Sequence, residues 1–319
     1  MRNIKLNHTD LSVSNIAFGT DSIGSLIDKK LSFSMLDLYF NEGGNLIDTA
    51  EGYADWLPDG KHASEKTIGE WLSARKNRSD IVISTKGGMY RAGEKHRLTE
   101  KNIFSDLEGS LKRLNTDYID IYWLHRDAKE VLVSEVMDIL AKAVRQGKVR
   151  YIGVSNWTNS RLDEANKYAE ENNLPKLFGS QIQYSPAVPN VEKNEPDLVL
   201  MNDREYDYFK NHDLTVFAFA SQAKGFFSKF EKGGKEALSP KAYTRYFNDE
   251  TIKRFERLKR IKEKLGCTMG NIVIATICNN YDFTAIPIIG CKNEEQLKDS
   301  LKGGDISLTR EELDFILKG

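Results

Sequence analysis

The chain has 319 residues, with 46 Lys and Arg against 47 Asp and Glu, and a formal net charge of −1. This balance argues against a dedicated nucleic-acid-binding protein, which usually carries a basic excess. The sequence has no run of ~18 apolar residues, so we expect no transmembrane helix and no membrane partner. Its first residues lack an apolar signal core, so we expect a cytoplasmic protein. Three cysteines, at Cys267, Cys278 and Cys291, match no metal motif, and no metal site is predicted.

Eight short segments rich in β-branched residues are predicted to be strands. In chain order they are residues 15–20, 45–50, 80–86, 119–125, 149–156, 180–186, 214–221 and 284–290. Helical patterns lie between them, most clearly over residues 64–75, 133–147 and 250–266. Strands that alternate with helices indicate a parallel sheet.

The closed barrel is favoured over an open sheet. An open dinucleotide-binding sheet would normally show G-x-G-x-x-G after its first strand, and "FGTDSIGSL" has the wrong spacing. Eight β/α units fit an α/β fold of the (β/α)8 type, a TIM barrel. Residues 2–14 read as a β-hairpin around "NHTD" that caps the barrel floor. The chain shows no linker, so we expect a single domain over residues 1–319.

Polar residues follow three consecutive strands. Asp48, Lys86 and His125 end strands two, three and four, and Tyr53 lies in the loop after strand two. Catalytic residues of such barrels lie at the C-terminal strand ends, and adjacent strands are ~4.8 Å apart, so these side chains can meet. Taken singly, Asp48 could cap a turn, Tyr53 could be a packed rim residue, Lys86 a solvated strand end and His125 a core histidine. Their joint position favours a catalytic site.

Several segments resemble the signature segments of the aldo-keto reductase family. They are "NLIDTAEGY", "ISTKGG", "YIDIYWLH", "IGVSN" and "SQIQYSP", in that order, with "LSVSNIAFGT" before them and "AIPIIGCKNEEQL" after them. The resemblance covers nearly the whole chain. It implies a barrel that binds NAD(P)H and interconverts an aldehyde or ketone, a sugar or related small carbonyl among them, with the alcohol by hydride transfer. It also implies that Asp48, Tyr53, Lys86 and His125 form a catalytic tetrad.

Physical chemistry gives each tetrad member a role. Tyr53 is the expected general acid, although a free tyrosine has a pKa of ~10. A cation ~4 Å away contributes about 4 kcal/mol at an effective dielectric of 20, so Lys86 is expected to bring Tyr53 close to working pH. Asp48 would keep Lys86 charged, and His125 would hydrogen-bond the substrate carbonyl.

The resemblance also implies the cofactor contacts. Ser155, Asn156 and Gln181 would hold the nicotinamide carboxamide, and Phe219 would stack on its ring. Gln296 stands where some relatives carry arginine, and a glutamine cannot bind a 2′-phosphate bidentately, but Lys292 is still expected to supply charge for it. NADPH is therefore expected, with NADH as the alternative. The remaining expected cofactor-binding residues are Gly19, Thr20, Asp48, Ser221, Gln222, Lys224, Gly290 and Ser300.

Three tryptophans, Trp56, Trp123 and Trp157, are expected at the substrate rim, although Trp123 can equally be core packing. Residues 93–100 are interpreted as a rim loop. Residues 221–250 are interpreted either as a solvated loop or as a partly ordered flap over the cofactor pyrophosphate.

Two other functions stay open. The barrel could be a regulatory subunit that binds NADPH and turns over slowly, or a Schiff-base aldolase that uses Lys86. The second would leave Ser155, Asn156 and Gln181 unexplained. The expected partner is a small carbonyl or alcohol, and the sequence indicates neither its identity nor the preferred direction nor the oligomeric state.

Overall fold

The computed structural model describes residues 1–91, 93–94 and 96–319. Eight parallel strands form a closed barrel in the order β10-β3-β4-β5-β6-β7-β8-β9. Each overlaps one predicted strand, so the predicted (β/α)8 barrel is confirmed. The strands are β3 (Ala17–Gly19), β4 (Leu46–Asp48), β5 (Val82–Gly87), β6 (Ile119–Leu124), β7 (Val149–Ser155), β8 (Gly179–Gln183), β9 (Thr215–Phe219) and β10 (Ala285–Ile289).

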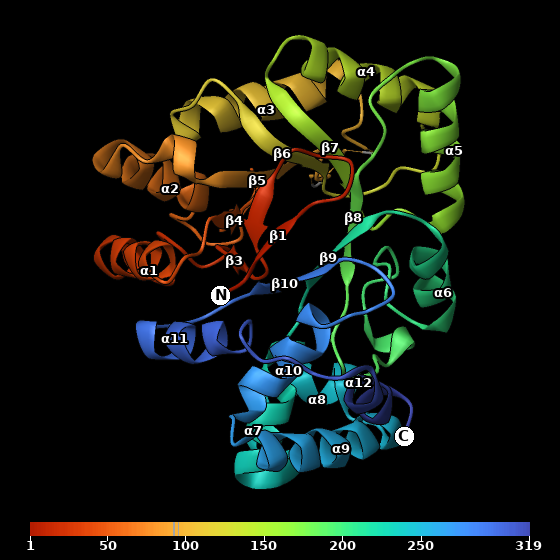
Figure 1. The fold of residues 1–319 in the computed structure, drawn as a ribbon. Coiled ribbons are helices and arrows are strands. Elements are labelled where there is room, and N and C mark those ends of the chain that lie inside the picture. Colours follow the sequence, from red (N-terminus) through yellow and green to blue (C-terminus); the bar gives the residue numbers. More distant parts are fainter. Residues whose placement is uncertain (92, 95) are drawn as a thin grey trace.

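Helices surround the barrel (Figure 1). Those that follow the strands are α1 (Lys29–Asn41), α2 (Ala63–Arg75), α3 (Glu100–Leu114), α4 (Val133–Arg145), α5 (Asn159–Glu171), α6 (Asp203–Asn211), α10 (Met269–Cys278) and α11 (Glu294–Lys302). The three predicted helices correspond to α2, α4 and α9 (Asp249–Leu265). On α4 the residues at helical spacing, Val133, Val136, Met137 and Leu140, are buried, as an amphipathic helix requires.

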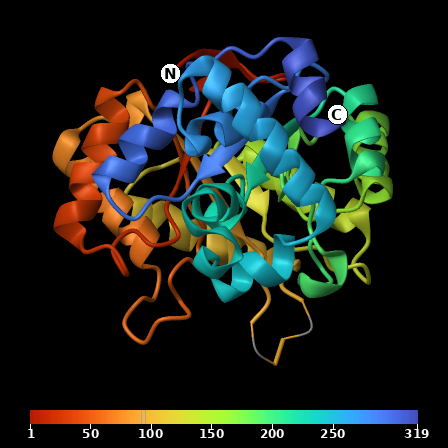
Figure 2. The same ribbon diagram turned by 90° about the horizontal axis from the view of Figure 1, so that it is seen from below.

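The N-terminal hairpin closes one end of the barrel. Strands β1 (Asn3–Lys5) and β2 (Ser12–Ser14) pair antiparallel. Leu6, Leu11 and Val13 are buried in one cluster with the residues that fill the barrel interior. Figure 2 shows the hairpin, in red, at the end opposite to the projecting loops that follow β4 and β5. The expected floor cap is therefore confirmed, and the other end of the barrel is left for the site.

Residues 221–250 form packed helices, so the interpretation of this segment as a solvated loop was wrong, whereas its role as a flap over the cofactor pyrophosphate stays a prediction. Helices α7 (Phe226–Gly233) and α8 (Pro240–Tyr246) gather with α9 and α12 (Arg310–Leu317) beside α10 (Figure 1). Phe226, Phe227 and Tyr246 are fully buried in a second apolar cluster. Burial of these large aromatic side chains stabilises the helices. A solvated loop would leave the same side chains exposed to water.

No helix within the described residues is long and apolar enough to cross a membrane.

Candidate active site

Lys86 is the centre of a buried polar group at the open end of the barrel. Strands β4 and β5 pair with Asp48 opposite Ser84, and Lys86 follows two residues later on the same inward face. The Lys86 Nζ donates to Asp48 Oδ2 at 2.6 Å, to the Thr49 carbonyl at 2.7 Å and to the Tyr53 hydroxyl oxygen at 3.0 Å. The three hydrogens of the ammonium therefore all have partners.

The loop after β4 returns to the end of β5, which places Tyr53 over Lys86. The Glu51 amide donates to the Lys86 carbonyl at 2.9 Å. Tyr53 then lies with its ring 4.7 Å from the Lys86 Nζ. Because the Tyr53 oxygen accepts from Lys86, its own hydroxyl hydrogen remains for another acceptor.

His125 lies next to Tyr53. Its amide donates to the Gly87 carbonyl at 2.8 Å, which holds the end of β6 against β5. The ring centroids of Tyr53 and His125 are 6.0 Å apart, edge to face. Among the protein atoms described, the buried Nδ1 of His125 has no hydrogen-bond partner. Tyr53 and His125 therefore present a hydroxyl group and an imidazole ring side by side at this end of the barrel.

The protonation states suit proton donation at neutral pH. Burial lowers the pKa of His125 well below 6.5, with Lys86 and Arg126 adding to the effect, so the imidazole is neutral. Burial alone would lower the pKa of Lys86, but Asp48 and Tyr53 outweigh it and the pKa is raised. Burial raises the pKa of Tyr53 to about 12, against the lowering effect of Lys86, which Asp48 partly offsets. The expectation that Lys86 brings Tyr53 close to working pH is thus not met in this structure, and Tyr53 stays protonated.

The residues expected at the nicotinamide lie together beside Asp48. Ser155 and Gln181 face each other at the ends of β7 and β8, and the Ser155 hydroxyl donates to the Gln181 carbonyl at 2.8 Å. The Asn156 amide donates to the Ser155 oxygen at 3.0 Å. The Gln181 amide donates to Asp48 Oδ1 at 3.0 Å. Thr20 joins the group because its amide and hydroxyl both donate to the Asp48 carbonyl. Adjacent hydroxyl and amide groups of this kind fit a carboxamide.

The residues expected at the cofactor phosphates lie between the β9 loop and α11. The Gln222 amide donates to Ser300 Oγ at 3.3 Å, and the Ser221 hydroxyl donates to the Ile288 carbonyl at 2.6 Å. Ala223, Lys224 and Gly225 are three consecutive residues with positive φ. Successive amides in such turns form concave anion sites.

The charges near this turn also fit phosphate. Burial lowers the pKa of Lys224, and Arg245 and Lys241 lower it further, as expected where cations converge. At the other end of the region, the Lys292 amide donates to Gln296 Oε1 at 3.0 Å, and the Lys292 side chain is exposed. Gly290 precedes them, and Gly19 and Phe219 lie at the ends of β3 and β9.

Of the three tryptophans expected at the substrate rim, one is exposed and two are buried. Trp56 is 60% exposed and lies edge to face with Tyr53, with ring centroids 6.5 Å apart. Trp123 and Trp157 are fully buried, so placing Trp157 at the substrate rim was wrong, and core packing, the alternative given for Trp123, is confirmed. Trp123 packs in the barrel interior, on the strand next to Lys86, and the Arg161 guanidinium covers Trp157 at 4.6 Å from its ring centroid. A position near a strand end does not give the depth of the side chain.

The expected rim segment 93–100 falls partly outside the described residues, since residue 95 is not among them. Arg97 and Leu98 are buried rather than on a rim.

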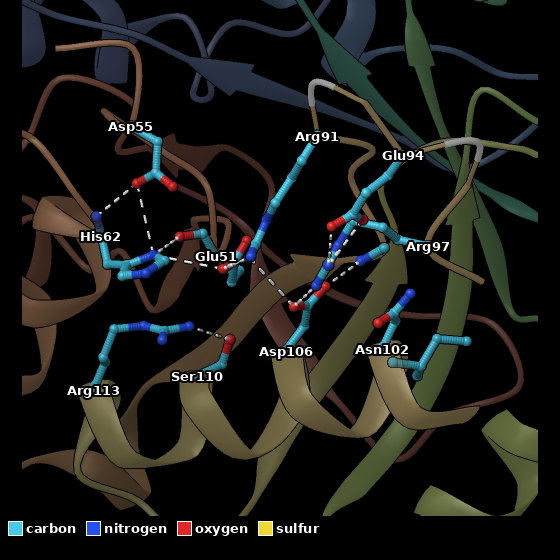
Figure 3. A network of polar contacts seen from close by, with 12 residues as sticks. Glu51, Asp55, His62, Arg91, Glu94, Arg97, Asn102, Asp106, Ser110 and Arg113 are labelled. Atoms are coloured by element: carbon cyan, nitrogen blue, oxygen red, sulfur yellow. Dashed lines mark hydrogen bonds and ion pairs between the residues drawn. The ribbon is translucent and has the colours of Figure 1, made fainter. Parts of the chain in front are cut away.

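A network of ion pairs behind the site was missed from the sequence (Figure 3). Arg91 Nη2 lies 2.6 Å from Glu51 Oε1 and 3.6 Å from Asp106 Oδ1. Asp106, on α3, also accepts from the Gly88 amide at 3.0 Å and pairs with Arg97. Burial and Asp106 raise the pKa of Glu51, against Arg91 and His62. The network ties the Tyr53 loop to α3, and no sequence spacing links these distant residues.

Glu51, Asp55 and His62 have potential ligand atoms within 4.8 Å of one another, which is close enough for a metal ion. However, His62 Nδ1 lies 2.7 Å from the Glu51 carbonyl and must donate to it, and Arg91 already binds the Glu51 carboxylate. We therefore interpret this group as part of the ion-pair network.

Comparisons with known proteins agree with this geometry. A model described as "Aldo/keto reductase family" matches residues 15–318. The chain is 29% identical to aryl-alcohol dehydrogenase (NADP(+)) of Phanerodontia chrysosporium over 96% of this chain and 82% of that protein. It is 27% identical to a probable voltage-gated potassium channel subunit beta of Arabidopsis thaliana over 94% of this chain and 90% of that protein. The fold matches the thermostable aldo-keto reductase Tm1743, solved with the inhibitor epalrestat, with a TM-score of 0.73 and 25% identity over 99% of this chain and 98% of that one.

The chain therefore belongs to the aldo-keto reductase family, as its segments predicted, and NAD(P)H-dependent carbonyl reduction is its general chemistry.

Proposed function

We propose that the protein is an NADPH-preferring oxidoreductase that interconverts a small aldehyde or ketone with its alcohol, with Tyr53 as the general acid. The observation that carries the proposal is the bridging Lys86 ammonium, which lies 2.6 Å from Asp48 Oδ2 and 3.0 Å from the Tyr53 oxygen. A buried, hydrogen-bonded cation in this place stabilises the phenolate that forms as Tyr53 gives up its proton.

A bound NADPH would supply a hydride to the carbonyl carbon, while the protein positions and polarises the substrate. Tyr53 donates its hydroxyl proton to the carbonyl oxygen, which becomes the alcohol. Lys86 donates to the Tyr53 oxygen throughout, and Asp48 keeps Lys86 charged and oriented. His125, being neutral, offers an N–H donor to the same carbonyl oxygen and orients it.

The cofactor contacts are part of the proposal. Ser155, Asn156 and Gln181 would hold the carboxamide, and the turn at Ala223–Gly225 with Lys224 would face the phosphates. Lys292 would supply the charge that favours NADPH over NADH.

We propose aromatic aldehydes as the first substrates to try. Trp56 is an exposed aromatic face beside Tyr53, and one relative is named an aryl-alcohol dehydrogenase. Small sugars form the second set, since aromatic faces also stack on sugar rings.

The test is a substrate panel followed at the nicotinamide absorbance, with NADPH and NADH. We expect turnover of at least one carbonyl, and we expect Tyr53→Phe to slow it by roughly 10²–10⁴-fold while cofactor binding is unchanged. Tyr168→Phe is the matched control, because it removes a hydroxyl that binds Asp138 on the outer surface. Tyr53→Phe turnover within tenfold of the wild type would refute the assignment.

A regulatory role is the second candidate, favoured by the likeness to a probable channel subunit beta. This role predicts that the wild type binds NADPH tightly but turns over carbonyls no faster than the Tyr53→Phe variant does. The aldolase alternative is disfavoured because the Lys86 ammonium is fully hydrogen-bonded and its pKa is raised, whereas a Schiff base needs the neutral amine.

A further inference from the structure

Asp48 is held from below by a chain of two hydrogen bonds that starts at a tryptophan. The Trp123 indole Nε1 donates to Ser84 Oγ at 2.7 Å. The Ser84 hydroxyl donates to Asp48 Oδ1 at 2.8 Å. Asp48 Oδ2 accepts from Lys86, which in turn donates to Tyr53. Trp123, Ser84 and Asp48 are all fully buried.

The chemistry of the three groups fixes which one donates in each of these hydrogen bonds. An indole nitrogen is a donor only and an ionised carboxylate an acceptor only. The Ser84 oxygen must therefore accept from Trp123, and its single hydrogen is committed to Asp48. With the Gln181 amide, Asp48 Oδ1 receives two neutral donors, while Oδ2 is left to Lys86.

The packing around Trp123 holds the indole in this orientation. Its ring centroid lies 4.9 Å from that of Phe217 and 5.4 Å from that of Phe178. On the neighbouring strand, a Cβ added at Gly153 would lie 2.3 Å from a Trp123 ring atom, so glycine leaves the room that the ring fills. A phenylalanine could fill most of this interior without a polar atom. The buried N–H therefore needs an explanation other than packing, since burying it is unfavourable unless it is hydrogen-bonded.

We propose that Trp123 and Ser84 are positioning residues that act through Asp48 to set how strongly Lys86 polarises Tyr53. Neutral donors on Asp48 Oδ1 spread its negative charge, so less of that charge opposes the Lys86 ammonium at Tyr53. Without the Ser84 hydroxyl, Asp48 would hold Lys86 more strongly, and Tyr53 would become a weaker acid. The inference rests on the proposed function, because Tyr53 is the acid there.

The first arm of the test is kinetic and uses Trp123→Phe, Ser84→Ala and the double variant. We expect Ser84→Ala to lower kcat about tenfold, the loss typical when a charged group loses one hydrogen bond, with unchanged KM and cofactor affinity. Trp123→Phe should lower kcat about threefold. The double variant should be no slower than Ser84→Ala, because the indole acts only through the hydroxyl. Losses that multiply in the double variant, or that appear in KM instead of kcat, would overturn the proposal.

Trp71→Phe is the matched control. Trp71 is also fully buried, and its indole Nε1 donates at 2.8 Å to a carboxylate, that of Asp37, away from the site. This variant should keep kcat within twofold of the wild type. Melting curves of all the variants report folding, and a kcat loss in Trp71→Phe as large as in Trp123→Phe would show that only packing is being measured.

The second arm needs no substrate, so it decides on the hydrogen-bond chain separately from the proposed function. The chain has four tryptophans, and their indole ¹⁵N–H signals can be assigned by substitution. We expect Ser84→Ala and Asp48→Asn each to move the Trp123 signal and to leave the Trp71 signal in place. If the Trp123 indole signal does not move in Asp48→Asn, the inference is overturned, even if the protein is an active reductase.

Discussion

Lys86→Met removes an ammonium whose nitrogen lies 3.0 Å from the Tyr53 oxygen and keeps a side chain of similar length. At that distance a phenolate and an ammonium attract each other by about 5.5 kcal/mol at an effective dielectric of 20, equivalent to about four pKa units. Asp48 offsets part of this, since it binds the same ammonium at 2.6 Å. We therefore expect initial rates of carbonyl reduction, followed at the nicotinamide absorbance, to fall by at least ~10²-fold.

The same substitution leaves the buried Asp48 carboxylate without its cation. Breaking a buried pair costs about 3–5 kcal/mol, which urea unfolding can measure. Adding Asp48→Asn to Lys86→Met removes the lone charge, so the double variant should recover most of the unfolding free energy but not the activity. If it recovered both, Lys86 would only balance Asp48, and the reasoning about Tyr53 would be refuted.

Three further outcomes are expected. Because the pKa of His125 is well below 6.5 and that of Tyr53 is about 12, the rate of reduction should be flat between about pH 6 and 9, and a limb near pH 6.5 would contradict the neutral imidazole. Arg91→Ala should raise the pKa of the buried Glu51 further, and a raised carboxyl pKa favours the protonated folded state. The free energy of unfolding relative to wild type should therefore fall more at pH 8 than at pH 4.5, by up to about 1 kcal/mol because Arg91 is half exposed. Lys292→Ala should reduce an expected roughly tenfold preference for NADPH over NADH, measured by tryptophan fluorescence, and an unchanged ratio would show that Lys292 does not bind the 2′-phosphate.

The strand-end residues could be placed from the sequence because two simple rules apply to them. Side chains alternate along a strand, and parallel strands end at one rim, so Asp48 and Lys86 had to meet. The same rules do not give depth, which is why the sequence left Trp123 open between the rim and the core, although it lies in the barrel interior. The pairing of Arg91 with Glu51 depends on how two loops fold back, and local sequence carries no signal for it.

The pKa of Tyr53 shows a different limit. A distance estimate from sequence includes the attraction of Lys86 but not the burial of the phenol, and burial is the larger effect. The helices within 221–250 were missed because their aromatic residues lie among many lysines and glycines. Those aromatic residues find their partners on the helices that follow, α9 and α10.

The way the barrel closes has a consequence for how the chain folds. Strand β3, at the beginning of the chain, pairs with β9's neighbour β10, near its end, and Arg2 donates to the Gly304 carbonyl at 3.0 Å. During synthesis, β3 can pair with β4 early, but β10 becomes available only when almost the whole polypeptide has left the ribosome. Contacts that join such distant segments slow folding and leave strand edges unpaired meanwhile. Until closure, Leu6, Leu11 and Val13 of the floor lack some of the interior residues that they pack against in the finished barrel, Phe217 and Ile286 among them.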